Sequence, residues 1–415
     1  FFFHPQPAIP DPLWSRGLGD VYKRQKNYKR PMIKKYLFCF LFLSLNCFGQ
    51  SLIPNPPQLT ATSYLLLDAK TLKIISENNA EQSTGMASIT KIMTAYVVAD
   101  QIQKGYLSGS SLVKISEKCW RMEGSRMFIK EGTEVPVSDL MLGIIVQSGN
   151  DASCALAEHI AGSEYDFAEL MNDYARQMNL EETNFINPTG LPDVNHYSTA
   201  EDIAKLSIKL IQDFPETYKI FSQKEFTYNE IRQLNRNSLL WQDDSIDGIK
   251  TGHTSTSGYC MVSSAKRGDM RLIAVTLNSS SEKSRLRDSR RLLDYGFRYY
   301  TTKKIISKYE PITSVDVWAG NEDSLELGPE EDIYVTLTKP EFNSLELIAS
   351  KNLGVKAPIR KNDVLDSLDI IVDGKKLESV NLVAVKRIDS KGFISSAFEA
   401  IGFYIYSFFM QDEVN

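Results

Sequence analysis

The chain has 415 residues, with 47 Lys and Arg against 52 Asp and Glu, and 42% of its residues are hydrophobic. This composition excludes a disordered or collagen-like chain, and the length suggests two or three domains with a large core. Eight of the basic and two of the acidic residues lie in the first 49 positions, which leaves 39 basic against 50 acidic residues, a net charge of −11. Nucleic-acid binders usually have a basic excess, so we expect no nucleic-acid partner.

The first 49 residues show two segments unlike a folded domain. Residues 1–31 have no hydrophobic period, and we interpret them as translated non-coding sequence upstream of a start at Met32. Two lysines then precede an apolar run over 36–45, and Cys47-Phe-Gly49 offers small residues for a cleavage site. A membrane-spanning helix needs about 20 apolar residues, more than this run has. We therefore predict a secretory signal peptide over 32–49 and an exported protein.

Cysteine and histidine are sparse in the remaining chain. Cys119, Cys154 and Cys260 form an odd set, which argues against a disulfide framework, and we expect three buried thiols. No pair of cysteines has the spacing of a zinc site, and the three histidines of this part show no close ligand spacing. We therefore predict no metal and no other cofactor.

The hydrophobic pattern predicts two strands, then helices, then further strands. A buried strand is expected over 63–68 with a hairpin partner over 73–77. Helical spacing predicts helices over 88–103, 138–147, 150–161, 164–179, 199–213 and 284–297. Strands are expected again over 225–229, 258–265 and 271–278. This order predicts an α+β fold in which helices flank an antiparallel sheet.

The pattern changes near Tyr300. Short β-rich runs separated by turn signals follow over 315–318, 333–337, 345–349, 369–372 and 382–385. They predict a small all-β sandwich domain over 301–390, after a first domain over 50–300.

The last segment, 391–415, has a broad apolar helical face. The run from Phe393 to Met410 would span about 27 Å as a helix, and Glu399 near its middle disfavours crossing a bilayer. We predict an amphipathic helix that lies in the membrane interface. A terminal helix docked on the core is the alternative.

The chemistry begins with Ser88-Ile-Thr-Lys91. At positions i and i+3 of a helix the two side chains share a face, so Lys91 could take the proton of the Ser88 hydroxyl and make it a nucleophile. The same pattern occurs at 263–266, in an expected strand, and at 280–283, in an expected loop. Only Ser88 begins a strongly periodic helix, whose first N–H groups favour negative charge.

Two further motifs follow. Ser148-Gly-Asn150 lies between two expected helices, and Lys250-Thr-Gly252 precedes an expected strand. The small residue at 252 would let a substrate backbone lie along a strand edge. Each motif is common alone, but this order, with gaps of about 60 and 100 residues, is far more specific.

With these motifs the chain resembles the serine penicillin-binding enzymes, and most closely the low-molecular-mass D-alanyl-D-alanine carboxypeptidases. The stretches 233–237, 247–254 and 295–297 are also similar, and the resemblance extends from about 50 to 410. It implies a catalytic domain with a five-stranded antiparallel sheet between helices, followed by a β-sandwich domain and a membrane anchor. It further implies enzymes at the periplasmic face of the cytoplasmic membrane. Such enzymes trim the last D-alanine from peptidoglycan stem pentapeptides and are acylated by β-lactams, and a homodimer is left open.

The resemblance also assigns a role to each residue of the first two motifs. Ser88 would be the acylated nucleophile and Lys91 its general base. Ser148 would relay protons, and Asn150 would hydrogen-bond Lys91 or the substrate. A free lysine has a pKa of about 10.4, so burial and the nearby Lys250 would have to lower the pKa of Lys91.

The resemblance assigns the remaining residues to substrate binding. They are Lys250, Thr251, Gly252, His253, Arg285 and, on the far rim, Arg236. Lys250 and Thr251 would engage the terminal carboxylate, with Arg285 in support. The backbone N–H groups of Ser88 and His253 would form the oxyanion hole.

Three alternative functions share parts of this pattern. A class A β-lactamase has all three motifs but also needs a Glu-x-x-Leu-Asn loop, which is absent between Asn150 and Lys250. An endopeptidase that cuts cross-links uses the same machinery, and the motifs do not separate it. A non-catalytic wall-binding protein would have a decayed site, whereas all three motifs are intact.

Overall fold

The computed structural model describes residues 53–350 and 354–391. The predicted leader over 1–31, the signal peptide over 32–49 and the amphipathic tail from residue 392 lie outside the described residues. Within the described ranges, no helix combines the length and the apolar character that a membrane crossing requires.

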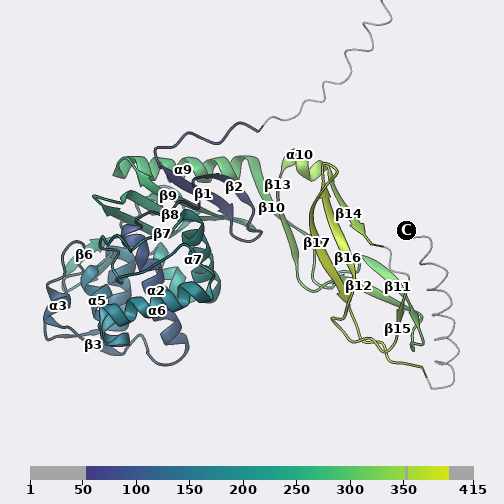
Figure 1. Ribbon diagram of the computed structural model, residues 1–415, viewed down its shortest axis with the longest axis horizontal. Coiled ribbons are helices and arrows are strands. Elements are labelled where there is room, and N and C mark those ends of the chain that lie inside the picture. The colour runs from purple at the N-terminus through teal and green to yellow at the C-terminus, as the bar shows by residue number, and fades with distance from the viewer. Residues whose placement is uncertain (1–52, 351–353, 392–415) are drawn as a thin grey trace, which may run out of the picture. The chain divides into compact units, whose positions relative to one another are not determined.

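A five-stranded antiparallel sheet organises the first part of the chain, as predicted (Figure 1). Its strand order is β2-β1-β9-β8-β7, so the first hairpin joins the last three strands through β1 and β9. The strands are β1 (Ser63–Asp68), β2 (Ile74–Asn78), β7 (Ile246–Thr254), β8 (Gly258–Arg267) and β9 (Met270–Ser279). The central strands are buried because both faces of the sheet are covered.

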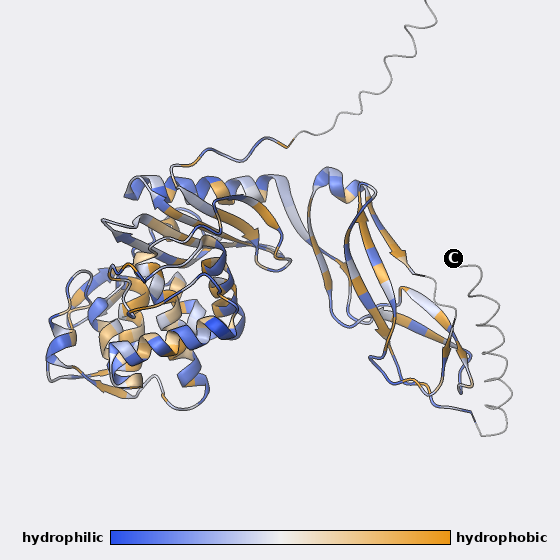
Figure 2. Ribbon diagram, viewed as in Figure 1, coloured by the Kyte–Doolittle hydropathy of each residue, from blue (hydrophilic) through white to orange (hydrophobic). Residues whose placement is uncertain are grey.

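One face of the sheet is covered by a single long helix, α9 (Glu282–Tyr299), which packs on β8 and β9. A group of helices covers the other face, with α7 against β1 and β9 (Figure 1). Its longer members are α2 (Lys91–Gln103), α5 (Asn150–Ala161), α6 (Glu164–Gln177) and α7 (Ala200–Asp213). Apolar residues, orange in Figure 2, gather inside this group.

The helix starts follow ordinary capping chemistry. The side chains of Ser163, Thr199 and Ser281 each accept a hydrogen bond from a backbone N–H in the first turn of α6, α7 and α9. These bonds satisfy N–H groups that have no partner inside the helix. The expectation of a loop over 280–283 is therefore wrong for its second half, because α9 begins at Glu282 with Ser281 as its N-cap.

Shorter elements connect the large ones. They are η1 (Ala87–Thr90), β3 (Leu112–Lys114), α3 (Glu117–Trp120), β4 (Glu134–Pro136), α4 (Val137–Leu142), η2 (Gly143–Gln147), α8 (Pro215–Tyr218), η3 (Lys219–Ser222), β5 (Glu225–Tyr228), β6 (Ile231–Leu234) and η4 (Ser238–Trp241). The expected helix over 138–147 is therefore α4 followed by the wider π-helical turn η2.

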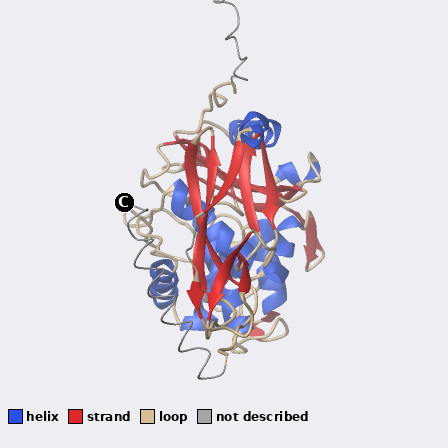
Figure 3. Cartoon of the chain, turned by 90° about the vertical axis from the view of Figure 1, so that its right-hand side faces the viewer, coloured by secondary structure: helices blue, strands red, loops and turns tan. Residues whose placement is uncertain are grey.

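The C-terminal part is a β domain, as predicted (Figure 3). β10 (Tyr300–Ile306) pairs with β13 (Ile333–Thr338), and a six-stranded sheet has the order β14-β16-β17-β12-β11-β15. Its strands are β11 (Thr313–Trp318), β12 (Ser324–Pro329), β14 (Leu345–Ala349), β15 (Val355–Lys356), β16 (Val364–Val372) and β17 (Lys375–Ala384), and the short helix α10 (Lys339–Asn343) follows β13. Fully buried leucines at 325, 327, 368 and 382 form its core.

The expectation of three free thiols is wrong. Cys119 on α3 and Cys154 on α5 form a disulfide, with their Cα atoms 5.3 Å apart. The two residues are 35 positions apart, and α3 packs directly against α5. Cys260 is a buried free thiol, as expected.

Candidate active site

The first motif lies where the helix group meets the sheet. Ser88 is in the 3₁₀ turn η1, and Lys91 is the first residue of α2. Ser88 is partly exposed, whereas Lys91 is only 1% exposed. The Lys91 Nζ atom lies 3.1 Å from Ser88 Oγ, so the predicted i and i+3 pair is in hydrogen-bonding contact.

Two more acceptors fix the Lys91 amine. Nζ lies 2.7 Å from Asn150 Oδ1 and 2.5 Å from the carbonyl oxygen of Thr189. A neutral amine has two N–H bonds and one lone pair. With the two N–H bonds directed at Asn150 and Thr189, the lone pair faces Ser88 Oγ, which is the geometry a general base needs.

Burial gives this amine a suitable pKa. Desolvation lowers the pKa of Lys91 to about 7, and the Asp151 carboxylate partly opposes this by favouring the charged form. The predicted direction is therefore confirmed. Burial alone accounts for the lowered pKa, and the predicted contribution of Lys250 is not among its causes.

A loop that no motif indicated supplies part of the site. The carbonyl of Pro188 accepts a hydrogen bond from the Thr94 hydroxyl on α2. The next carbonyl, that of Thr189, accepts one from Lys91 Nζ. Asn187 Oδ1 accepts from the N–H groups of Thr189 and Gly190, which holds the turn in place. Backbone contacts between residues about 100 positions apart leave no side-chain signature in the sequence.

The second motif joins η2 to α5, between two helical segments as expected. Asn150 is the first residue of α5, and its Nδ2 donates to the carbonyl of Glu123 at 2.7 Å. Ser148 has a positive φ of 67° and is buried. Its Oγ has no hydrogen-bond partner among the described residues, so the hydroxyl is available to a ligand.

Asp151 is a site residue that the sequence reasoning missed. It is buried, and its carboxylate accepts hydrogen bonds from the backbone N–H groups of Met127 and Phe128. The carboxylate thereby ties the segment before β4 to the start of α5, beside Asn150. Its place directly after Ser148-Gly-Asn150 was the available signal.

The third motif was expected to precede a strand, but it lies within one. Lys250, Thr251 and Gly252 belong to β7, the edge strand, where Lys250 pairs with Val262 of β8. Gly252 leaves little room for a side chain, because a Cβ there would lie 3.1 Å from the Ser88 nitrogen and 3.0 Å from the Met86 carbonyl oxygen. The strand edge therefore closely faces the Ala87–Ser88 peptide.

Several cations gather around this strand. Lys250 is 2% exposed, and burial followed by the charges of Lys91, Arg285 and Arg236 lowers its pKa well below the usual value. Each of these side chains disfavours the charged form of Lys250. A bound carboxylate would reverse that effect, so the cluster has the electrostatics of an anion-binding site.

The remaining predicted residues border the same strand. The buried Arg285 donates from Nη1 to the carbonyl oxygen of Gly252 at 3.1 Å and from Nη2 to Glu282 at 3.1 Å. Arg236 is exposed at the rim. His253 is exposed, and its imidazole stacks on Tyr259 with the ring centres 4.1 Å apart.

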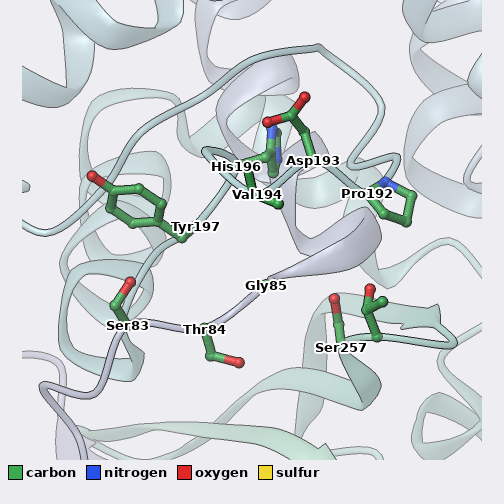
Figure 4. A pocket seen from close by; sticks show the side chains of 10 residues that line it. Ser83, Thr84, Gly85, Pro192, Asp193, Val194, His196, Tyr197 and Ser257 are labelled. Carbon is green, nitrogen blue, oxygen red and sulfur yellow. The ribbon is translucent and has the colours of Figure 1, made fainter.

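A hollow of about 460 Å³ is lined by segments close in sequence to the motifs (Figure 4). It is lined by 83–85, which lead into η1, by residues 192–194, 196 and 197, and by Thr256 and Ser257 of the turn after β7. Ser257 is buried, and its backbone N–H donates to Thr254 Oγ1 at 2.9 Å, which closes the turn. The same three segments that carry Ser88, Thr189 and Gly252 thus continue into the walls of this hollow.

The one cluster of potential metal ligands among the described residues consists of Cys119, Cys154 and Glu158. Both sulfur atoms of that cluster are joined in the disulfide. Its thiolates are therefore not available as ligands.

Comparison with known protein families gives two matches. Residues 50–281 match the family described as D-alanyl-D-alanine carboxypeptidase. Residues 300–390 match the C-terminal domain of penicillin-binding protein 5. Together the two matches span the catalytic motifs and the β domain.

Individual relatives agree. The chain is 38% identical over 368 residues to the D-alanyl-D-alanine carboxypeptidase DacA of Escherichia coli, which covers 87% of this chain and 91% of that protein. It resembles a crystal structure of penicillin-binding protein 5 from Haemophilus influenzae with a TM-score of 0.76 and 39% identity, covering 81% of this chain and 100% of that one. A penicillin-binding protein of Listeria monocytogenes in its ampicillin-bound form matches 58% of this chain and 100% of its own, with a TM-score of 0.54 and 28% identity.

Proposed function

This chain belongs to the D-alanyl-D-alanine carboxypeptidase family, and we propose that it removes the terminal D-alanine of peptidoglycan stem pentapeptides through an acyl-enzyme on Ser88. The observation that carries the proposal is the contact of 3.1 Å between Lys91 Nζ and Ser88 Oγ, with the amine held by Asn150 and Thr189. It pairs a nucleophile with a base whose pKa burial has lowered to about 7.

In the first step the neutral Lys91 takes the proton of Ser88 as Oγ attacks the carbonyl carbon of the penultimate D-alanine. The carbonyl oxygen becomes an oxyanion and accepts hydrogen bonds from the backbone N–H groups of Ser88 and His253. One such donor contributes roughly 3 kcal/mol to transition-state stabilisation. The Gly252 position supports this geometry, since it leaves the Ser88 nitrogen uncovered.

The intermediate collapses when the carbon–nitrogen bond breaks and D-alanine leaves. The leaving amine takes the proton that Lys91 accepted, relayed through the hydroxyl of Ser148, which is buried and unpartnered among the described residues. Water then attacks the ester carbonyl, Lys91 again acts as base, and Ser88 is released. A β-lactam acylates Ser88 by the same first step, with its amide opened instead of a peptide bond cleaved.

The terminal carboxylate would bind at Lys250 and Thr251, with Arg285 behind the strand and Arg236 at the rim. The positive charges of Lys91, Arg285 and Arg236 disfavour the charged form of Lys250, and an anionic ligand would relieve this repulsion. The upstream residues of the stem peptide would then run along β7 toward Thr254 and the hollow lined by Thr256 and Ser257.

Covalent labelling tests the proposal. The full chain is treated with a fluorescent penicillin, and the modified peptide is located by mass spectrometry. We expect the label on Ser88 and its complete loss in Ser88→Ala. Ser263→Ala is the matched control, because Ser263 begins another Ser-x-x-Lys sequence but lies in β8, and it should retain the label. A label elsewhere, or one that persists in Ser88→Ala, would contradict the proposal.

We further propose that the protein is exported and is held at the periplasmic face of the cytoplasmic membrane by its tail. The support is the signal-like sequence over 32–49 and the apolar helical pattern of 391–415. In co-sedimentation with phospholipid vesicles, we expect the full chain in the pellet and a chain that ends at residue 391 in the supernatant. Equal behaviour of the two would contradict the anchor.

A further inference from the structure

The peptide bond between Ala87 and Ser88 is held from its carbonyl side. Its N–H is the oxyanion donor in the proposed function. Ala87 has a φ of +48°, an uncommon conformation for a residue with a side chain. The backbone of Gly190 abuts the Ala87 carbonyl so closely that a Cβ there would lie 1.9 Å from its oxygen. Because a peptide unit is planar, whatever orients this carbonyl also orients the N–H of Ser88.

The Ala87 carbonyl receives a hydrogen bond from a buried hydroxyl. Thr90 Oγ1 donates to the Ala87 oxygen at 2.8 Å, and Thr90 is fully buried. A hydroxyl has one proton to donate. Since that proton goes to Ala87, Thr90 Oγ1 must act as acceptor toward its other neighbour, His196 Nε2, at 2.7 Å.

The imidazole of His196 is fixed in the tautomer that this arrangement requires. The backbone N–H of Ile186 donates to Nδ1 at 3.0 Å, so Nδ1 is unprotonated and the ring proton is on Nε2. His196 is 3% exposed, and burial lowers its pKa to about 4, which keeps the ring neutral at pH 7. In Figure 4 its side chain lies beside Asp193 at the wall of the hollow.

We propose that His196 and Thr90 are positioning residues for the oxyanion hole, acting through a directed chain of hydrogen bonds from Ile186 N–H to the Ala87 carbonyl. The inference rests on the proposed function, because it concerns the N–H of Ser88. Neither side chain touches the reacting atoms. Their contribution is to hold the Ala87–Ser88 peptide so that its N–H points at the developing negative charge, without reorganisation during the reaction.

The test compares two substitutions of Thr90 in the full chain. Thr90→Val keeps the shape and removes the hydroxyl, whereas Thr90→Ser keeps the hydroxyl and removes a methyl group. The second-order rate of acylation by a fluorescent penicillin should fall about 10- to 100-fold in Thr90→Val and stay within about threefold of wild type in Thr90→Ser. The KM for a D-Ala-D-Ala peptide should change far less than kcat, because the lost interaction is made in the transition state.

A transition-state analogue gives an independent readout. A peptide boronic acid forms a tetrahedral adduct on the serine, and one of its oxygens occupies the oxyanion position. Its affinity should fall in Thr90→Val by about the same factor as the acylation rate. A second pair, His196→Leu and His196→Gln, removes or retains an N–H donor toward Thr90 and tests the relay even where Thr90→Val does not fold.

The coupling between the two residues completes the test. In a Thr90→Val background, His196→Leu should cost little further activity, because His196 acts through Thr90. Normal acylation by folded Thr90→Val, or equal losses in Thr90→Ser and Thr90→Val, would overturn the relay alone. Absence of acylation in the wild-type protein would instead overturn the proposed function on which the relay rests.

Discussion

Lys91 is the residue on which the proposed chemistry most depends. It must be neutral to accept a proton, and burial lowers its pKa to about 7. Below that pH the fraction of neutral amine falls about tenfold per unit. The rate of acylation by a fluorescent penicillin, measured below saturation from pH 5.5 to 9, should therefore rise with pH and level off above about 7. A flat profile, or a rise that continues up to pH 9, would contradict the role of Lys91 as base.

Gly252 gives a steric prediction. In Gly252→Ala the new Cβ would lie 3.1 Å from the Ser88 nitrogen, so it would crowd one proposed oxyanion donor. We expect acylation to fall about 10- to 100-fold while the fold is retained. Gly109→Ala is the control, because its nearest neighbour would be Ser138 Cβ at an ordinary 3.7 Å. Wild-type acylation by Gly252→Ala would show that the strand edge is not as close to Ser88 as described.

At the scale of residues, the sequence predicted those members of the site that act through their side chains. Ser88, Lys91, Asn150 and Lys250 were identified from motifs, and the structure brings them together. The carbonyl of Thr189 could not be found, because every residue has a carbonyl and only the fold brings this one to Lys91.

The disulfide between α3 and α5 matters at the scale of elements. It closes a loop of 35 residues next to Asn150, and restricting the unfolded chain in this way contributes about 3–4 kcal/mol in the loop-entropy account. The double variant Cys119→Ala, Cys154→Ala should therefore unfold at a lower urea concentration, and dithiothreitol should destabilise the wild-type protein but not this variant.

Cys260 supplies the control for that prediction. It is buried and unpaired, so dithiothreitol should destabilise Cys260→Ala as much as it does the wild-type protein. Peptide mapping without reductant should find Cys119 and Cys154 linked. Recovery of both as alkylated thiols would contradict the disulfide.

Elements with a clear hydrophobic period were predicted closely, and those without one were missed. The strand over 63–68 has the observed bounds, and the helix over 150–161 coincides with α5. Strand β7 was not predicted because the sequence from Lys250 to His253 lacks the apolar run that marks a buried strand. Lys250 is nevertheless buried in this strand. The disulfide was missed because its formation depends on the packing of α3 on α5 and not on spacing.

For the whole molecule, the buried His196 predicts a loss of stability in acid. Its folded pKa of about 4 is below the usual 6.5, so between these values the unfolded chain binds a proton that the folded chain does not. Stability is complete above pH 6.5 and decreases as the pH falls toward 4, by about 3 kcal/mol in total. Urea unfolding at pH 7 and 4.5 should show a smaller loss in His196→Gln than in wild type. Equal losses would contradict a neutral buried ring.

The central claim is that this chain is a carboxypeptidase that acts through Ser88, and release of D-alanine tests it most directly. The full chain and Ser88→Ala would each be incubated with diacetyl-Lys-D-Ala-D-Ala, and free D-alanine would be measured with D-amino-acid oxidase. We predict steady release by the wild-type protein and none by Ser88→Ala. Release that persists in Ser88→Ala, or a wild-type protein that releases none, would contradict the claim.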